Sequence, residues 1–198
     1  GYNGKVYISP SENIKKEYSH LVSQEEELSQ QLKGLTDKTA TTIDDVTIPL
    51  YANSGLVAGI SPSKESGAEG IGLYRTEYPF MSRQRFPGEE EQSAIYREVM
   101  SEMAPRPVVL RTLDIGGDKS LSYFPINEDN PFLGWRGIRV TLDHPEIFKI
   151  QLRAMLIASR GLNNLYILFP MVSRVSEVEE AIRILKQSRL ELIAEGYK

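Results

Sequence analysis

The feature that most restricts the fold is an alternation of short apolar runs with longer segments of helical periodicity, which starts near residue 46. The apolar runs lie at 47–53, 70–77, 107–114 and 165–172. They are apolar on both sides instead of alternating, which is typical of parallel strands covered by helices. We therefore predict an α/β fold in which four strand–helix units build one parallel sheet.

The segments between these runs carry helix signals. Ser61 and Pro62 suit the start of a short helix that ends at Gly67, and three glutamates follow Pro87 where a helix dipole favours acids. Apolar residues three or four apart continue the pattern further on. The predicted helices are 61–67, 87–103, 144–159 and 173–195.

The first 45 residues have a different composition. A strand is predicted at 5–8, closed by a Ser-Pro pair, and Ser11 could cap the helix that follows. Residues 12–33 form a long amphipathic pattern with a thin apolar stripe, which predicts a solvated connector helix stopped by Gly34. The polar stretch 36–45 is predicted to be a linker.

Two architectures fit the alternation in residues 46–198. A (β/α)₈ barrel takes about 250 residues, so about four units would make half of one, a partial TIM barrel. An open doubly wound sheet normally has a glycine-rich phosphate turn after its first strand, and the Asn53-Ser54-Gly55 turn is a weak match. Both architectures place chemistry at the carboxyl ends of the strands.

Composition excludes several classes of function. The 198 residues have a net charge of −4, so we expect no nucleic-acid or membrane-surface partner. There are no cysteines, which removes disulfides, thiolate metal sites and a cysteine nucleophile from these residues. No apolar run approaches the roughly 20 residues of a membrane span. We expect a cytoplasmic protein, and the absence of an initiator Met indicates an excised piece of a longer chain.

The strongest functional signal is a repeated motif at two strand ends. The apolar residues 71–74 are followed by Arg75-Thr76-Glu77, and the apolar residues 108–110 are followed by Arg111-Thr112-Leu113-Asp114. Neighbouring parallel strands lie about 4.8 Å apart, so two arginines at equal height could grip one small anion. The guanidinium fork suits phosphate and carboxylate. We predict that Arg75 and Arg111 bind such an anion.

The alternative is structural. Arg75 could pair with Glu77 or with an acid on a helix, and Arg111 could pair with Asp114. Composition alone does not separate this interpretation from ligand binding. The duplication of the motif favours ligand binding.

Two further cations follow the second motif. Lys119 comes after a glycine pair that allows a tight turn, and Arg136 lies beside the sole tryptophan, Trp135, in a long connection at 121–139. Long connections at the active face of an α/β fold are often functional. An ordinary hairpin turn and a structural lid are the alternatives.

Four motifs in this order resemble a known family. They read Gly-Ile-Gly-Leu-Tyr-Arg-Thr-Glu at 70–77, Leu-Arg-Thr-Leu-Asp-Ile-Gly-Gly-Asp-Lys at 110–119, Asn-Pro-Phe-Leu-Gly-Trp-Arg at 130–136 and Phe-Pro-Met at 169–171. Together they resemble the phosphoenolpyruvate-binding barrel of the phosphoenolpyruvate-protein phosphotransferases (Enzyme I). By this resemblance, residues 1–10 are the last strand of a swivelling phosphohistidine domain, 11–45 the linker, and 46–198 the first half of the barrel.

The resemblance also implies a mechanism. In the family, phosphoenolpyruvate binds with Mg²⁺ at the carboxyl end of the barrel, and its phosphoryl group passes to an enzyme histidine and then to a small histidine phosphocarrier protein. Arg75 and Arg111 match the arginines that hold the phosphate, and Lys119 and Arg136 match nearby basic positions. A homodimer is expected for the full-length protein.

Several parts of that machinery are expected outside this sequence. The accepting histidine would precede Gly1, and the magnesium ligands and other catalytic groups would follow Lys198, so we predict no catalytic or metal-binding residue here. His20 and His144 are predicted to be structural. The 198 residues alone are therefore not expected to catalyse the whole transfer.

Alternative functions remain both among enzymes and among non-catalytic proteins. Pyruvate phosphate dikinase and phosphoenolpyruvate synthase use related motifs, although the match at 110–119 favours the protein-phosphorylating member. A non-catalytic anion sensor or scaffold is the alternative outside the enzymes. The Tyr-Pro-Phe-Met sequence at 78–81 favours a nitrogen-regulatory parent over a sugar-transport one.

Overall fold

The computed structural model describes residues 4, 6–117, 119–126, 129–130 and 133–197. The chain divides into two compact units, Gly1–Thr47 and Ile48–Lys198. Each unit is described by itself.

The first unit is dominated by one long helix. Helix α1 (Glu12–Lys33) has 22 residues, and none of its side chains is buried, as expected for a solvated connector. Ser11 stands at its N-cap but makes no side-chain capping bond. The strand predicted at 5–8 is wrong for the residues described, because residues 6–8 are irregular. An extended segment becomes a strand only when a neighbour pairs with its backbone groups.

The second unit contains the predicted alternation of strands and helices. Its elements, in chain order, are β1 (Tyr51–Ser54), η1 (Val57–Gly59), α2 (Ile60–Glu65), β2 (Gly70–Arg75), α3 (Glu77–Met81), α4 (Glu89–Met103), β3 (Val108–Arg111), α5 (Ile138–Asp143), α6 (Pro145–Ser159), β4 (Leu165–Leu168) and α7 (Val175–Ala194).

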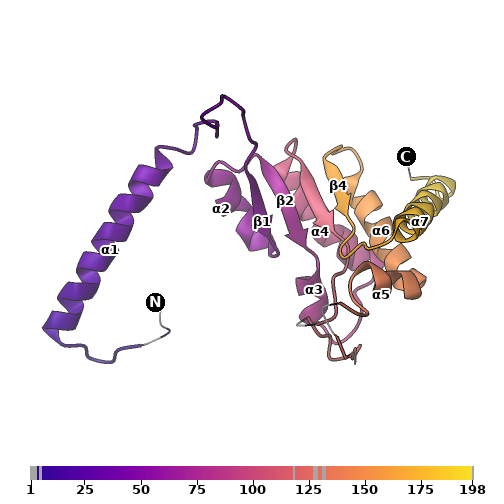
Figure 1. Cartoon of the computed structure of the whole chain (residues 1–198), viewed down its shortest axis with the longest axis horizontal. Coiled ribbons are helices and arrows are strands. Elements are labelled where there is room, and N and C mark those ends of the chain that lie inside the picture. The colour runs from indigo at the N-terminus through magenta and orange to yellow at the C-terminus, as the bar shows by residue number, and fades with distance from the viewer. Residues whose placement is uncertain (1–3, 5, 118, 127–128, 131–132, 198) are drawn as a thin grey trace. The chain divides into compact units, whose positions relative to one another are not determined.

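The strands form one parallel sheet in the order β1-β2-β3-β4 (Figure 1), so each strand pairs with its successor in the sequence. The predicted α/β class and parallel sheet are confirmed. The sheet register places Arg75 opposite Arg111, and Arg111 opposite Leu168. All strand ends that could carry a site therefore lie at one edge of the sheet.

Helices cover one face of this sheet. Ile71, Val108 and Leu110 pack with Met100 of α4 and Met155 of α6 in the main core. A second cluster joins α5, α6 and α7 around a fully buried phenylalanine of α6. These clusters fix the helices to the strands through apolar burial, at about 25 cal/mol per Å².

The other face of the sheet is open among the residues described. Successive side chains of a strand point to opposite faces. Tyr166, which lies between the core-facing Leu165 and Ile167, is 59% exposed. Tyr51 on β1 is also exposed. Helix cover on both faces is therefore not observed, although the apolar runs suggested covered strands.

Element boundaries differ from the prediction at several places. The strands predicted at 47–53, 107–114 and 165–172 are observed only at Tyr51–Ser54, Val108–Arg111 and Leu165–Leu168. The run at 70–77 stops as a strand at Arg75, and Glu77 opens the short helix α3. Ser61 does not cap the short helix α2, which begins at Ile60 and follows the 3₁₀ turn η1. The long connection ends in a helix, α5, that the sequence did not indicate. A one-turn helix carries too few residues for its period to be recognised.

Within the described part of the chain, no helix is long and apolar enough to cross a membrane.

Candidate anion-binding site

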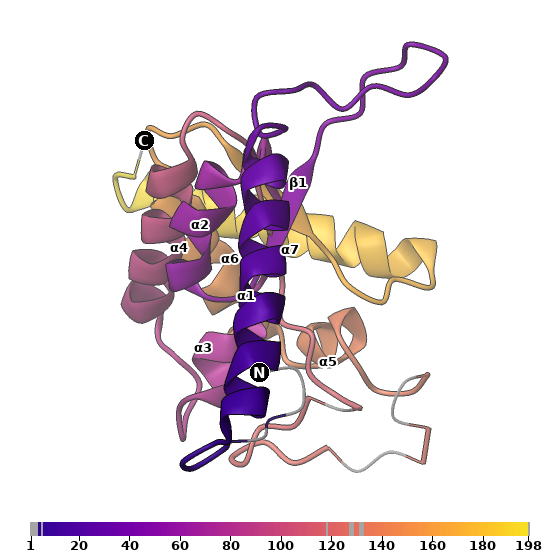
Figure 2. The ribbon, with the colours of Figure 1, turned by 90° about the vertical axis from the view of Figure 1, so that its left-hand side faces the viewer.

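The site predicted from the repeated motif lies where β2 and β3 end. Arg75 is the last residue of β2 and Arg111 the last of β3, and they are register partners on neighbouring parallel strands. Figures 1 and 2 show α3 and α5 beyond this edge of the sheet. The prediction that the two arginines stand level is confirmed for their strand positions.

Arg75 makes fewer described internal contacts than Arg111. Its guanidinium carbon lies 5.1 Å from the centre of the Tyr78 ring, a distance typical of a cation–π contact. Its Nε is buried without a hydrogen-bond partner. No ion pair involves Arg75 in the part of the chain that the structure describes. The described contacts therefore do not include the Arg75–Glu77 pair that was the alternative.

Arg111 is held by two internal carboxylates. Its Nη2 donates to Glu77 Oε1, and its Nη1 lies 3.2 Å from Asp114 Oδ2. Both acids are almost fully buried, with 2% and 3% of their side chains exposed. For Arg111, the structural pairing that the sequence left open is present in this structure. Its Nε nevertheless remains buried and unpartnered.

Lys119 and Arg136 join the same cluster. Lys119 Nζ lies 2.5 Å from Glu77 Oε1 and 3.3 Å from Asp114 Oδ2. Arg136 Nε donates to Asp114 Oδ1 over 3.1 Å. The four site residues predicted from the sequence therefore meet at one edge, three of them around two carboxylates.

Gly116 shows why the glycine pair follows Asp114. Gly116 has a φ of +116°, a region that side-chain-bearing residues rarely adopt. A Cβ at this position would lie 2.9 Å from the carbonyl oxygen of Trp135 and 3.1 Å from the Cβ of Arg136. The missing side chain thus lets the loop that carries Arg136 approach the turn after β3.

Among the residues described, cationic side chains outnumber acids in this cluster. Four cationic side chains and two carboxylates meet at the strand ends. Burial alone would raise the pKa of the Asp114 carboxyl. The hydrogen bond from Arg136 and the charges of Arg111 and Lys119 outweigh this effect, and the pKa is lowered below its usual value. Asp114 is therefore ionised at neutral pH.

Sequence reasoning missed the residues behind the charged groups. Thr76 and Gln151 are fully buried and hydrogen-bonded to each other over 3.1 Å. A polar residue in an otherwise apolar helix face, such as Gln151 next to Leu152, is the signal that could have indicated a buried network.

Of the two histidines, His144 has a packing role. Its ring lies against Phe124 and Trp135, with centroids 5.1 and 5.6 Å away, and its Nδ1 is 3.3 Å from Glu146. His20 is exposed on α1. Neither residue belongs to the cluster at the strand ends.

The described residues contain no group of three or more histidine, cysteine, aspartate or glutamate side chains placed to hold a metal ion. Glu77 and Asp114 share the same cationic neighbours, and each carboxylate is already paired with positive side chains. Three cations beside them would repel a divalent ion. These residues by themselves do not fit a Mg²⁺ site.

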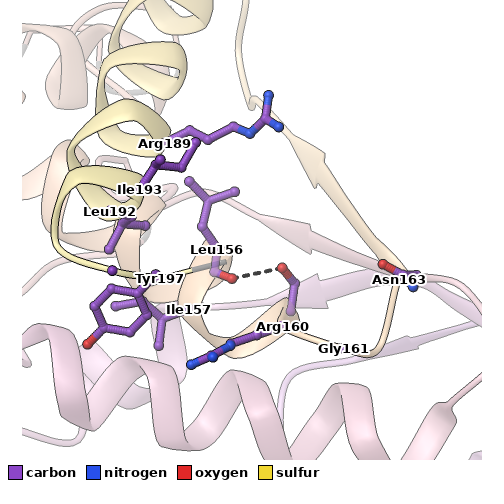
Figure 3. A pocket seen from close by; sticks show the side chains of 11 residues that line it. Leu156, Ile157, Arg160, Gly161, Asn163, Arg189, Leu192, Ile193 and Tyr197 are labelled. Atoms are coloured by element: carbon purple, nitrogen blue, oxygen red, sulfur yellow. Dashed lines mark hydrogen bonds between the residues drawn. The ribbon is translucent and has the colours of Figure 1, made fainter.

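A separate cavity of about 550 Å³ lies at the opposite, amino end of the sheet. It is enclosed by the end of α6, the turn before β4 and the end of α7 (Figure 3). Leu156, Ile157 and Leu192 line it, and the side chains of Arg160 and Arg189 point in different directions. None of the predicted site residues lines this cavity.

Comparison with known proteins supplies the class. Residues 29–198 match the PEP-utilising enzyme, PEP-binding domain family, and the chain belongs to that family. The phosphoenolpyruvate-dependent phosphotransferase system proteins of Salmonella typhimurium and Escherichia coli are each 47% identical over 97% of this chain and 26% of their own length. The phosphoenolpyruvate-protein phosphotransferase of Staphylococcus carnosus is 45% identical over the whole chain and 35% of its own length. The chain spans about a quarter to a third of these relatives.

Proposed function

We propose that this chain is the phosphoenolpyruvate-binding part of a phosphoenolpyruvate-protein phosphotransferase. The observation that carries the proposal is the pair of arginines, Arg75 and Arg111, in register at adjacent strand ends within a PEP-binding family domain. Lys119 and Arg136 add positive charge to the same edge. Phosphoenolpyruvate combines a phosphate and a carboxylate, the two groups that a guanidinium fork binds best.

The two arginines have different tasks in this proposal. Arg75 makes no ion pair with a described residue, so it can bind a phosphate oxygen without breaking one. Arg111 is oriented toward the site by Glu77 and Asp114. Oriented cations stabilise negative charge as it moves from one acceptor oxygen to another, at little reorganisation cost.

We propose a partial (β/α)₈ barrel as the architecture. The strands follow one another in sequence order, and the described helices pack on one face of the sheet. A doubly wound sheet would instead reverse its strand order and carry helices on both faces. The open face that bears Tyr166 would then be the inner wall of the barrel.

The proposed reaction includes Mg²⁺, but not with Glu77 and Asp114 as its ligands. The described residues do not gather three metal-binding side chains, and the two carboxylates of the site are bound to cations. We propose that Mg²⁺ is held by groups other than Glu77 and Asp114.

The rest of the proposed reaction follows the relatives. We propose that the phosphoryl group passes from phosphoenolpyruvate to a histidine other than His20 and His144, and then to a small histidine phosphocarrier protein. A cytoplasmic homodimer in the nitrogen-regulatory branch completes the proposal. Assays with purified carriers of both branches, and sedimentation of the full-length protein, test these last points.

The central experiment is calorimetric titration of the chain with phosphoenolpyruvate. The wild type should bind, and Arg75→Ala and Arg111→Ala should each weaken binding by about tenfold or more, the value of a charged hydrogen bond. Arg183→Ala is the matched control, since Arg183 makes an exposed pair with Glu180 on α7. Absence of binding by the wild type would contradict the proposed ligand.

A non-catalytic scaffold is the second candidate, and the pairing of Arg111 with Glu77 and Asp114 favours it. In that case the arginine is a structural ion pair. The same titration separates the two, because a scaffold would show no phosphoenolpyruvate binding. Phosphotransfer assays with labelled phosphoenolpyruvate are expected to show no turnover by the 198 residues alone.

A further inference from the structure

A buried amide on α6 connects the two strand ends that carry the arginines. Gln151 Nε2 donates to Thr76 Oγ1 over 3.1 Å, directly after Arg75. Its Oε1 accepts from the backbone N–H of Leu113 over 2.8 Å, two residues after Arg111. One side chain therefore bridges the ends of β2 and β3.

The bridge continues into the strand and into a second helix. Thr76 Oγ1 donates to the carbonyl oxygen of Arg111 over 2.8 Å, which ties the two strand ends directly. The other hydrogen of Gln151 Nε2 reaches the Tyr96 hydroxyl of α4 over 3.1 Å, and that hydroxyl donates to Gln92. Both N–H groups of the Gln151 amide are thus used, and its oxygen is bonded.

Burial makes these bonds decisive for geometry. Gln151 and Thr76 are both 0% exposed, so no water can replace a lost partner without rearrangement. A buried polar group that loses its hydrogen bond is costly, and a fully satisfied network holds a single arrangement. The network lies under the charged cluster, and the described hydrogen bonds of Gln151 go to Thr76, Tyr96 and Leu113 and to none of the four cations.

A second buried amide does a comparable task at the other end of the sheet. Asn164, which is 2% exposed and precedes β4, donates to the carbonyl oxygens of Met100 and Arg106 over 3.0 and 2.9 Å. It joins α4 to the segment before β3, far along the strands from Arg75 and Arg111. The molecule thus offers two buried amide crosslinks that differ in which end of the sheet they fix.

We propose that Gln151 is a positioning residue for the anion site: by binding the chain after β2 and after β3, it keeps Arg75 and Arg111 at equal height. The proposal rests on the proposed function for its ligand, and on the hydrogen bonds above for its geometry. Glu77 and Asp114 orient the side chain of Arg111. The Gln151 amide fixes the position of the backbone that follows each arginine.

The test compares Gln151→Met with Asn164→Leu, two replacements of similar size to the amides that they remove. Both variants lose buried hydrogen bonds, and both should unfold at lower temperature than the wild type. Titration with phosphoenolpyruvate should show about tenfold weaker binding by Gln151→Met and unchanged binding by Asn164→Leu. Equal affinity in Gln151→Met and the wild type would overturn the positioning role.

Thr76→Val serves as the second variant in case Gln151→Met does not fold. It removes the hydroxyl that accepts from Gln151 and donates to Arg111, and it keeps the shape of the side chain. Its affinity for phosphoenolpyruvate should fall in the same direction. A stable Thr76→Val with wild-type affinity would count against the bridge.

NMR separates a failed ligand from a failed bridge. The guanidinium Nε–H resonances of Arg75 and Arg111 should shift in Gln151→Met and stay in place in Asn164→Leu, with no ligand present. If the wild type does not bind phosphoenolpyruvate but these shifts occur, the proposed function fails and the positioning role stands. If the resonances do not move in Gln151→Met, the positioning role fails whatever the ligand.

Discussion

The two ends of the sheet are built on opposite principles. At the carboxyl end, Glu77 and Asp114 are buried among cations, and Arg75 and Arg111 keep buried nitrogen atoms without partners. At the amino end, the cavity is lined mainly by apolar side chains, and its arginines are exposed. Unpaired buried polar atoms are costly. The carboxyl end carries such atoms on three charged side chains, Arg75, Glu77 and Arg111, whereas the one on Asn164 at the amino end belongs to a neutral amide. Unpartnered charged groups indicate where the fold is arranged for a ligand instead of for its own stability.

Removal of Arg111 should have the largest effect on stability at the carboxyl end of the sheet. In Arg111→Ala, Glu77 and Asp114 lose a partner while they remain buried, and the free energy of unfolding should fall by about 3 kcal/mol or more. Chemical denaturation of the variant beside wild type measures this change. A loss below about 1 kcal/mol would mean that Lys119 and Arg136 suffice to neutralise both acids.

The pH dependence of the cluster should produce the next largest effect. The pKa of Asp114 is lowered in the folded protein, so its ionised form stabilises the fold above the unfolded pKa of about 4. This contribution is lost as the pH falls through the lower folded pKa. Wild type should therefore be more stable than Asp114→Asn at pH 7, and the difference should shrink below about pH 4.

Thermal unfolding of both proteins at pH 7, 4 and 3 measures that difference. Other acids with a lowered pKa, such as Glu177 and Glu195, titrate in both proteins and cancel in the comparison. A difference that stayed constant over this range would show that the charge of Asp114 does not contribute.

Removal of Arg75 should have the opposite pattern, with a small effect on stability and a large effect on binding. Because Arg75 makes a cation–π contact and no described ion pair, Arg75→Ala should cost only about 0.5–1 kcal/mol of stability. The same change should weaken phosphoenolpyruvate binding by about tenfold. Denaturation and titration on one preparation test both statements. A large destabilisation with unchanged binding would assign Arg75 to the structure and not to the site.

The smallest effect is expected at the amino end. Arg189 lines the cavity there, and its side chain is exposed on α7. Arg189→Ala should change the affinity for phosphoenolpyruvate less than twofold and the stability by less than about 0.5 kcal/mol. A clear loss of affinity would show that the two ends are coupled.

Periodicity was sufficient for the architecture and insufficient for its details. Apolar runs predicted all strands of the second unit, because burial selects the same residues that periodicity measures. The predicted strand at 70–77 ran two residues too far, since the tertiary contacts of Glu77 with Arg111 and Lys119 accompany the turn into α3. Such contacts lie more than 30 positions apart and leave no local pattern.

The site followed the same division. The repeated arginine motif correctly placed Arg75 and Arg111 at one edge, because parallel strands of similar length bring equivalent positions together. Which arginine is paired internally was left open by the sequence, since both have an acid within three residues. Gln151 lay in a helix 40 positions from Arg111 and was not recognised as part of the network.

The register between β2 and β3 has a consequence for how this region can change. Successive residues of a strand face opposite ways, so one inserted or deleted residue within Gly70–Arg75 would turn Arg75 from its neighbour and send core side chains outward. Replacing a residue keeps this phase, whereas changing the length does not. Changes in length should therefore be rejected within Gly70–Arg75, whereas replacements that keep the phase can be accommodated.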